Sequence, residues 1–172
     1  MLKTLERADS RDELGKPGDD PLALDTVPAA ASLLHVTVER LFRLFKAQMS
    51  ATLEECGSSI VEWRILLMLR THGEMAQRDL VREVAMVQAQ VSRTLTVMQN
   101  RNLVHIRRSR DDRRVRLFRL TPAGVALYDS MSPAMAQRKA MLDNVLTAQE
   151  TETFLHTARV IAATLDQHEP GT

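Results

Sequence analysis

A cluster of arginines lies near the middle of the chain, between residues 101 and 119. Eight arginines stand there against two carboxylates, Asp111 and Asp112, so the segment has a net charge of +6, whereas the whole 172-residue chain has +1. Guanidinium groups concentrated in this way bind anions, such as nucleic acid, a membrane surface or a phosphorylated ligand. The alternative, from charge alone, is a solvated surface hairpin without a partner.

A second group of polar side chains lies just upstream. It consists of Gln88, Gln90, Ser92, Arg93 and Thr94. In the major groove of duplex DNA, glutamine can pair with adenine and arginine with guanine through two hydrogen bonds each, so Arg93 is the strongest candidate for reading a base. Gln77 and Arg78, which come earlier, are expected to hold phosphates. The alternative is that all of them are ordinary solvated helix residues.

Other kinds of chemistry find little support in the sequence. The five histidines fall on separate elements without metal-ligand spacing, and neither a glycine-rich phosphate loop nor a nucleophile motif is present. We therefore expect no enzyme activity, no metal and no cofactor. Aromatic residues make up only 3% of the chain, which disfavours a stacking platform for single-stranded nucleic acid and favours duplex DNA.

Composition indicates a soluble protein without a membrane partner. No apolar run approaches the roughly 18 residues of a membrane span, and the N-terminus lacks the basic head and apolar stretch of a secretory signal. Cys56 is the only cysteine, which excludes a disulfide framework within the chain and suits a reducing cytoplasm.

The polar residues must be positioned by helices, and four helices are predicted before the arginine cluster. Their ranges are 32–55, 60–73, 76–84 and 87–103. Ser58 or Ser59 can cap the second helix and Gly73 can end it. The third and fourth form a helix-turn-helix, in which the fourth presents its amides and Arg93 outward.

The arginine cluster itself reads as a β-hairpin followed by two more helices. Alternating apolar residues predict strands over 104–109 and 115–120, which together would form a wing. Thr121 can cap a helix that begins at Pro122, and Thr147 with Glu150 forms a capping box for a last helix that reaches about residue 167. The predicted fold class is mainly α with a small β-hairpin wing, a winged helix-turn-helix.

The run SRTLTVMQNRNLVHIRRSRDDRRVRLFRLTPAG, residues 92–124, resembles the MarR family of winged helix-turn-helix transcriptional regulators. Four pieces match the family pattern in order and spacing: Arg-Thr-Leu in the recognition helix, Leu-Val after it, Asp-Arg-Arg in the wing, and Leu-Thr-Pro-Ala-Gly beyond. Asn102 replaces the family's usual glycine, which is tolerable because asparagine readily adopts a left-handed conformation. The order of helices extends the resemblance over residues 32–167.

The resemblance implies a cytoplasmic homodimer that binds palindromic double-stranded DNA and no membrane. Helices 32–55 and 122–167 would form an intertwined dimerisation region, and residues 58–120 the DNA-binding lobe. In the wing, Asp112 would pair with a neighbouring arginine, Arg110 would add positive charge, and Arg113 or Arg114 would enter the minor groove. Which of the two enters is left open.

The resemblance also implies a small-molecule effector that releases DNA, so that the protein would be a repressor. Residues expected near such a ligand are His35, Arg43, Trp63 and Arg64, which offer an aromatic wall and cations for an aromatic acid or an acyl thioester. Core packing and salt bridges explain the same residues. A thiol-sensing repressor that uses Cys56 and an activator with the same fold are the alternatives.

The first 30 residues differ in character from the rest. They contain four basic and seven acidic residues, with prolines and glycines that interrupt any periodicity. We expect an acidic mobile N-terminal tail over 1–30, or a loosely docked arm, ahead of a single domain over 31–172.

Overall fold

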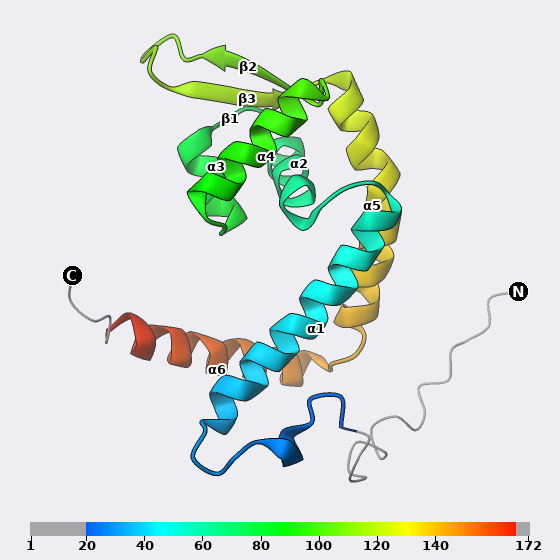
Figure 1. Cartoon of the computed structure of the whole chain (residues 1–172), viewed down its shortest axis with the longest axis vertical. Helices are drawn as coiled ribbons and strands as arrows, with labels where there is room; N and C mark the ends of the chain where they lie inside the picture. Colours follow the sequence, from blue (N-terminus) through cyan, green and yellow to red (C-terminus); the bar gives the residue numbers. More distant parts are fainter. Residues whose placement is uncertain (1–19, 168–172) are drawn as a thin grey trace, which may run out of the picture. The chain divides into compact units, whose positions relative to one another are not determined.

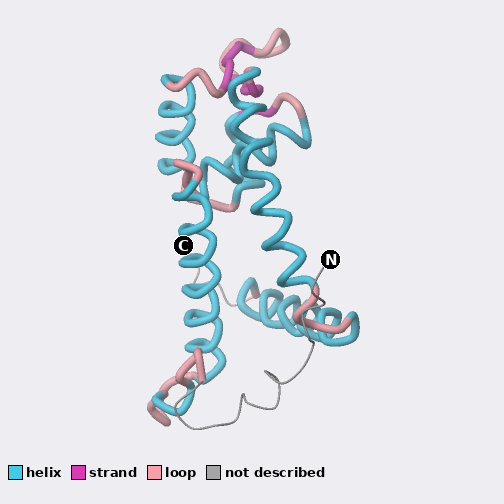
Figure 2. The backbone as a smooth tube through the Cα atoms, turned by 90° about the vertical axis from the view of Figure 1, so that its right-hand side faces the viewer, coloured by secondary structure: helices cyan, strands magenta, loops and turns pink. Residues whose placement is uncertain are grey.

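The structure is a computed structural model that describes residues 20–167 (Figure 1). The chain divides into two compact units, residues 1–55 and residues 56–172, and each unit is considered by itself. Helices dominate both units, and the strands of the described residues form one small antiparallel sheet in the second unit (Figure 2). The predicted fold class, mainly helical with a winged hairpin, is confirmed.

The order of elements also follows the prediction, with two additions, the short 3-10 helix η1 and the strand β1. The helices are η1 (Leu24–Thr26), α1 (Leu33–Glu55), α2 (Ile60–His72), α3 (Gln77–Val84), α4 (Gln88–Asn100), α5 (Pro122–Asp143) and α6 (Ala148–Asp166). The strands are β1 (Met75–Ala76), β2 (Val104–Arg108) and β3 (Arg116–Leu120). Helix boundaries agree with the sequence within three residues, and the largest difference is that α4 ends at Asn100 instead of near residue 103.

In the first unit, the segment before α1 is held to that helix. Arg40 of α1 donates hydrogen bonds to the carbonyl oxygens of Leu22, at 2.7 Å, and of Ala23. The backbone amides of Leu24 and Leu22 donate to the Asp20 carboxylate and, with a smaller contribution from Arg40, lower its pKa. This turn is therefore stabilised above the ordinary pKa of aspartate and loses that contribution as the pH falls through the lowered value.

The rest of the predicted N-terminal tail, residues 1–19, lies outside the described residues. On α1 itself, several large apolar side chains are exposed. The exposed ones are Leu33, Leu34, Val38, Phe42, Leu44 and Phe45.

Helix α2 forms the centre of the second unit. Ser59 caps it by accepting a hydrogen bond from the Glu62 amide, and Gly73 ends it with a φ of 78°, both as predicted. Nearly half of its residues are buried, and it packs against α3, α4, α5 and β3. The helix-turn-helix and the wing are therefore built on a common core.

The sheet has the strand order β1-β3-β2, with antiparallel pairing throughout. Strand β3 lies in the middle: Val104 of β2 faces Leu120, and Met75 of β1 faces Phe118. Phe118 is fully buried and anchors the wing to the core. The alternation of apolar and polar residues did not predict β1, because a strand of two residues is too short to show it.

The junction between α4, β2 and α5 is tightly packed. Asn102 has the left-handed φ of 56° expected for its place after α4, and the Leu103 amide closes the helix end by donating to the Met98 carbonyl at 2.8 Å. Thr121 caps α5 and also donates from its hydroxyl to the Asn102 carbonyl. Gly124 lies so close to Leu103 that a Cβ atom there would be 2.1 Å from the Leu103 carbonyl oxygen.

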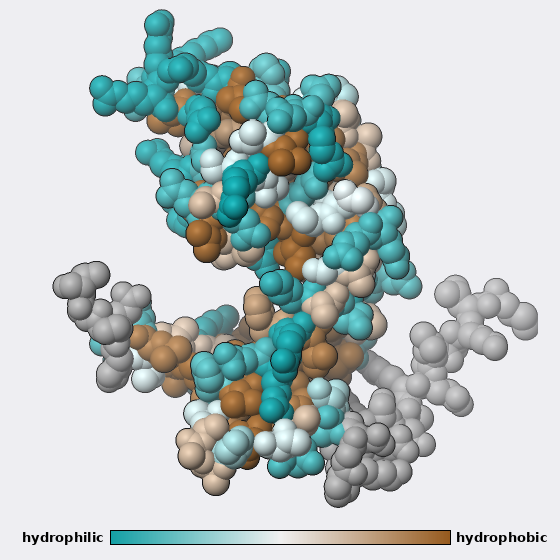
Figure 3. Space-filling model, in the orientation of Figure 1, coloured by the Kyte–Doolittle hydropathy of each residue, from teal (hydrophilic) through white to brown (hydrophobic). Residues whose placement is uncertain are grey.

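Helix α5 packs against α2 and buries Gly124 and Met131, whereas α6 adds no residue to the core. The predicted capping box of α6 is present, since Thr147 and Glu150 exchange hydrogen bonds. None of the 19 residues of α6 is buried, and this includes its large apolar side chains: Phe154 is 55% exposed and Leu165 is 67% exposed. Hydrophobic side chains are visible along this helix in Figure 3.

Candidate nucleic-acid interface

Helix α4 has one buried face and one face open to solvent. The buried residues are Val91, Leu95 and Met98. Because helical side chains repeat every 3.6 residues, the opposite face carries Ala89, Arg93 and Thr96, and all three are exposed. The open face is therefore polar, with Arg93 at its centre.

The five side chains predicted to read bases are not equally available. Gln88, Gln90 and Arg93 are exposed, whereas Ser92 and Thr94 are half-buried on the flanks of α4. The Nε atom of Arg93 donates to the carbonyl oxygen of Ala89, at 3.3 Å, which draws its side chain toward the start of the helix. Its two terminal amino groups form no hydrogen bond or ion pair with the described residues, so they can donate to an external acceptor.

A basic hollow of about 470 Å³ lies where α3, α4 and the wing approach one another. Its lining includes Gln77 and Arg78 from the first turn of α3, Gln88 from the first turn of α4, and Arg114 and Arg116 from the wing. The structure thus brings together residues that the sequence assigned separately to phosphate binding and base reading. No acidic side chain lines this hollow.

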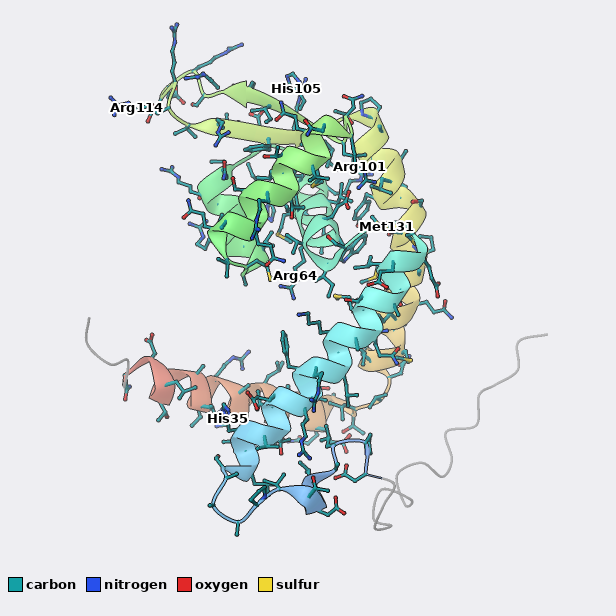
Figure 4. All side chains as sticks on the ribbon, viewed as in Figure 1. His35, Arg64, Arg101, His105, Arg114 and Met131 are labelled. Atoms are coloured by element: carbon teal, nitrogen blue, oxygen red, sulfur yellow. The ribbon has the colours of Figure 1, made fainter. Side chains whose placement is uncertain are left out.

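The wing tip is held by its own hydrogen bonds. The Asp112 carboxylate accepts a hydrogen bond from the backbone amide of Arg114 at 2.8 Å, and Arg108 donates to the Arg113 carbonyl at 3.0 Å. The resemblance implied that Asp112 pairs with an arginine side chain, but within residues 20–167 Asp112 forms no ion pair. Its role at the tip is to order the backbone, which leaves Arg113 and Arg114 exposed; Figure 4 shows Arg114 at the tip.

Two of the eight clustered arginines form ion pairs within the fold. Arg101 pairs with Glu62 of α2 at 2.7 Å, and Arg107 forms a two-pronged ion pair with Glu74. The other six form no ion pair with the described residues, and hydrophilic side chains cover the wing (Figure 3). The basic segment therefore presents fewer charges to a partner than its sequence indicates.

The Glu62–Arg101 pair connects the central helix to the end of α4. The Glu62 side chain is 7% exposed, whereas that of Arg101 is 41% exposed. In Figure 4, Arg101 is seen at the end of α4 that adjoins α5. This pair fixes where α4 ends relative to α2.

The residues expected near a ligand have contacts of their own. Trp63 stacks on Tyr128 of α5, with ring centroids 5.2 Å apart and parallel planes, and Arg64 donates to the Val84 carbonyl at the end of α3 at 3.0 Å. His35 and Arg43 belong to the first unit, where His35 lies 3.4 Å from Glu39. Tyr128 was not singled out from the sequence, because a lone tyrosine in a helix carries no pattern.

Within residues 20–167, no group of three or more histidine, cysteine, aspartate or glutamate side chains could hold a metal ion. In the same range, no helix is both long and apolar enough to cross a membrane. Cys56 is half-buried and has a free thiol.

Comparisons with known proteins agree with this geometry. Residues 57–115 match the MarR family. The chain is 27% identical to the HTH-type transcriptional repressor NicR of Pseudomonas putida over 142 residues. This alignment covers 81% of this chain and 86% of NicR.

Solved structures give the same result. AbsC, a MarR family transcriptional regulator from Streptomyces coelicolor, superposes with a TM-score of 0.72 at 21% identity over 83% of this chain and 98% of AbsC. A second structure concerns the regulation of DNA binding of Bordetella bronchiseptica BpsR by 6-hydroxynicotinic acid. BpsR superposes with a TM-score of 0.59 at 25% identity, over 73% of this chain and 98% of BpsR.

The α3–α4 pair and the β2–β3 wing define a winged helix-turn-helix protein of the kind that regulates transcription. Within this class, residues 57–115 match the MarR family, to which the sequence resemblance also pointed.

Proposed function

We propose that the protein binds double-stranded DNA sequence-specifically, with α4 in the major groove and the wing against the adjacent minor groove. One observation carries this assignment: a basic hollow joins the first turns of α3 and α4 to the wing, and the same helix α4 exposes Gln90 and Arg93. Bases are read by the N-terminal part of such a helix, and surrounding cations neutralise phosphates.

The direct test is a mobility-shift assay with the DNA upstream of the protein's own gene and of neighbouring genes, followed by footprinting. A protected, roughly symmetric site that persists against excess random duplex is the expected result. Equal affinity for all sequences would contradict specific binding.

Replacing Arg93 with alanine should weaken binding to the best site by about 1–3 kcal/mol, because a two-pronged contact with a base is lost. Preference should be relaxed at one base position only, as measured by competition with single-base variants. Arg119→Ala is the control: it removes one charge of the same arginine cluster from β3, outside the basic hollow, and should weaken binding to all sequences alike. If Arg93→Ala weakens all sequences equally, Arg93 binds a phosphate.

We further propose that the protein is a homodimer. Helix α6 has an apolar stripe that no described residue buries, and α1 exposes another. Such stripes are stable in water when a second copy covers them. The dimer would set the two α4 helices about one helical turn of DNA apart, roughly 34–36 Å.

Light scattering at micromolar concentration should therefore give the mass of two chains. Phe154→Glu should shift this mass toward one chain, because it places a charge in the covered stripe, whereas Glu152→Gln on the same helix should not. A monomer for the unaltered chain would exclude the dimer.

Finally, we propose that the protein is a repressor that a small aromatic acid releases from DNA. The name of its relative NicR and the ligand named for BpsR support this proposal. Because linkage is reciprocal, the ligand should bind the free protein more tightly than the DNA complex, typically by 1–3 kcal/mol. Titration of 6-hydroxynicotinic acid with and without the operator measures this difference. Equal affinity in both states would exclude this compound as an inducer.

A further inference from the structure

Val87 is unusual among the apolar side chains of this protein. It immediately precedes α4 and is 72% exposed, more than any other large hydrophobic side chain of the described residues. Its neighbours Gln88, Ala89 and Gln90 are exposed as well. An isolated apolar side chain among polar ones does not form the contiguous patch that a protein partner needs.

Val87 is the N-cap residue of α4, a position that favours side chains with an oxygen atom. The residue before a helix normally accepts a hydrogen bond from the first turn through a side-chain oxygen, and valine cannot do so. This chain follows the rule at four helices, which are capped by Ser32, Ser59, Thr121 and Thr147. Helix α3 departs from it as well, but Ala76 before it is buried in the core, whereas Val87 is exposed. Val87 gives α4 no side-chain cap.

Valine at this place therefore costs helix stability and also leaves an apolar side chain in water. Positions that violate local rules without a gain in the fold are concentrated at functional sites. The N-terminal end of the recognition helix is the part that reaches base edges. The single apolar group on the major-groove edge of a base pair is the C5-methyl of thymine.

We propose that Val87 reads a thymine by packing on its C5-methyl group and so contributes to operator specificity. The inference rests on the proposed function, since it needs α4 in the major groove. It adds a discrimination that hydrogen bonds do not supply, because apolar contact identifies thymine by its methyl group. Gln88 and Arg93 remain the readers of hydrogen-bonding edges.

The test uses the full-length protein and an operator selected from random duplexes. Each thymine in one half-site is replaced singly by uracil, which keeps base pairing and removes only the methyl group. Dissociation constants are measured for the unaltered protein and for Val87→Ala, Val87→Ser and Val97→Ala. Val97 is the matched control because it is an exposed valine farther along the same helix.

For the unaltered protein, one uracil position should weaken binding by about fourfold, the effect of one buried methyl group. Val87→Ala and Val87→Ser should bind the thymine and uracil operators equally at that position, whereas Val97→Ala should keep the fourfold difference. Val87→Ser also supplies a cap, so its melting temperature should rise by about 2–4 °C, which shows that its altered binding does not reflect misfolding.

Two results would overturn the inference while leaving the proposed function intact. One is specific binding without sensitivity to uracil at any position, and the other is a uracil effect that both Val87 variants retain in full. If selection yields no preferred sequence, the proposed function fails, and the inference fails with it.

Discussion

Replacement of Gly124 by alanine should lower the free energy of unfolding by about 3 kcal/mol or more, which makes it one of the most damaging single changes available in this chain. The added Cβ would lie 2.1 Å from the Leu103 carbonyl oxygen, far inside contact distance, and 3.4 Å from the Leu120 side chain. The carbonyl belongs to the backbone, so it cannot move aside by changing a rotamer. Either α5 or the start of β2 must shift.

The shift should also be visible in DNA binding, because β2 is the first strand of the wing. We expect a lower melting temperature together with weaker affinity for the operator. Gly57→Ala is the control: no atom lies within 4 Å of its added Cβ, so only its φ of 67° costs energy, about 1–2 kcal/mol. If the two variants melt at the same temperature, the close approach at Gly124 is not important.

The elements of this fold could be predicted because their signals are local. Ser59, Thr121 and the Thr147–Glu150 pair cap the predicted helices through bonds to residues within three positions. Asn102 adopts the left-handed conformation that its place after α4 requires. Each of these bonds needs only the neighbouring chain, so sequence alone identifies the residues.

Contacts between distant segments left no such signal. Arg101 pairs with Glu62 39 positions away, and Arg107 with Glu74 33 positions away, so both arginines were counted with those expected to meet an anion. Spacing along the sequence cannot separate a guanidinium used by the fold from one left for a partner. The two acids had no apparent role until the fold placed them beside the wing and α4.

At the candidate site, too, some residues could be predicted from the sequence and others could not. The sequence identified Gln88, Gln90 and Arg93 through their hydrogen-bonding groups, and all three are exposed on α4. It gave no reason to select Val87, because an apolar residue at a helix start is normally assumed to be buried. Exposure is a property of the folded chain, so this residue became a candidate only with the structure.

The second large effect is expected at the pair that joins α2 to the end of α4. Arg101→Ala should lower the free energy of unfolding by about 3 kcal/mol, because it leaves the buried Glu62 carboxylate without its counter-charge. This is the low end of the usual range for a broken buried pair, since Arg101 is 41% exposed and water can partly replace it. Affinity for the operator should fall too, because the end of α4 loses its ion pair with α2.

Substitution of Glu62, the other partner of the pair, should lower the free energy of unfolding by less. Glu62→Gln removes the buried charge and leaves Arg101 able to reach solvent, so we expect a loss of about 1 kcal/mol. In the double variant, Glu62→Gln should recover most of the stability that Arg101→Ala removes, because no charge is then left buried. Urea unfolding of the four proteins at one protein concentration measures the coupling. Additive losses would show that the pair does not hold α4, and that Arg101 acts through its packing alone.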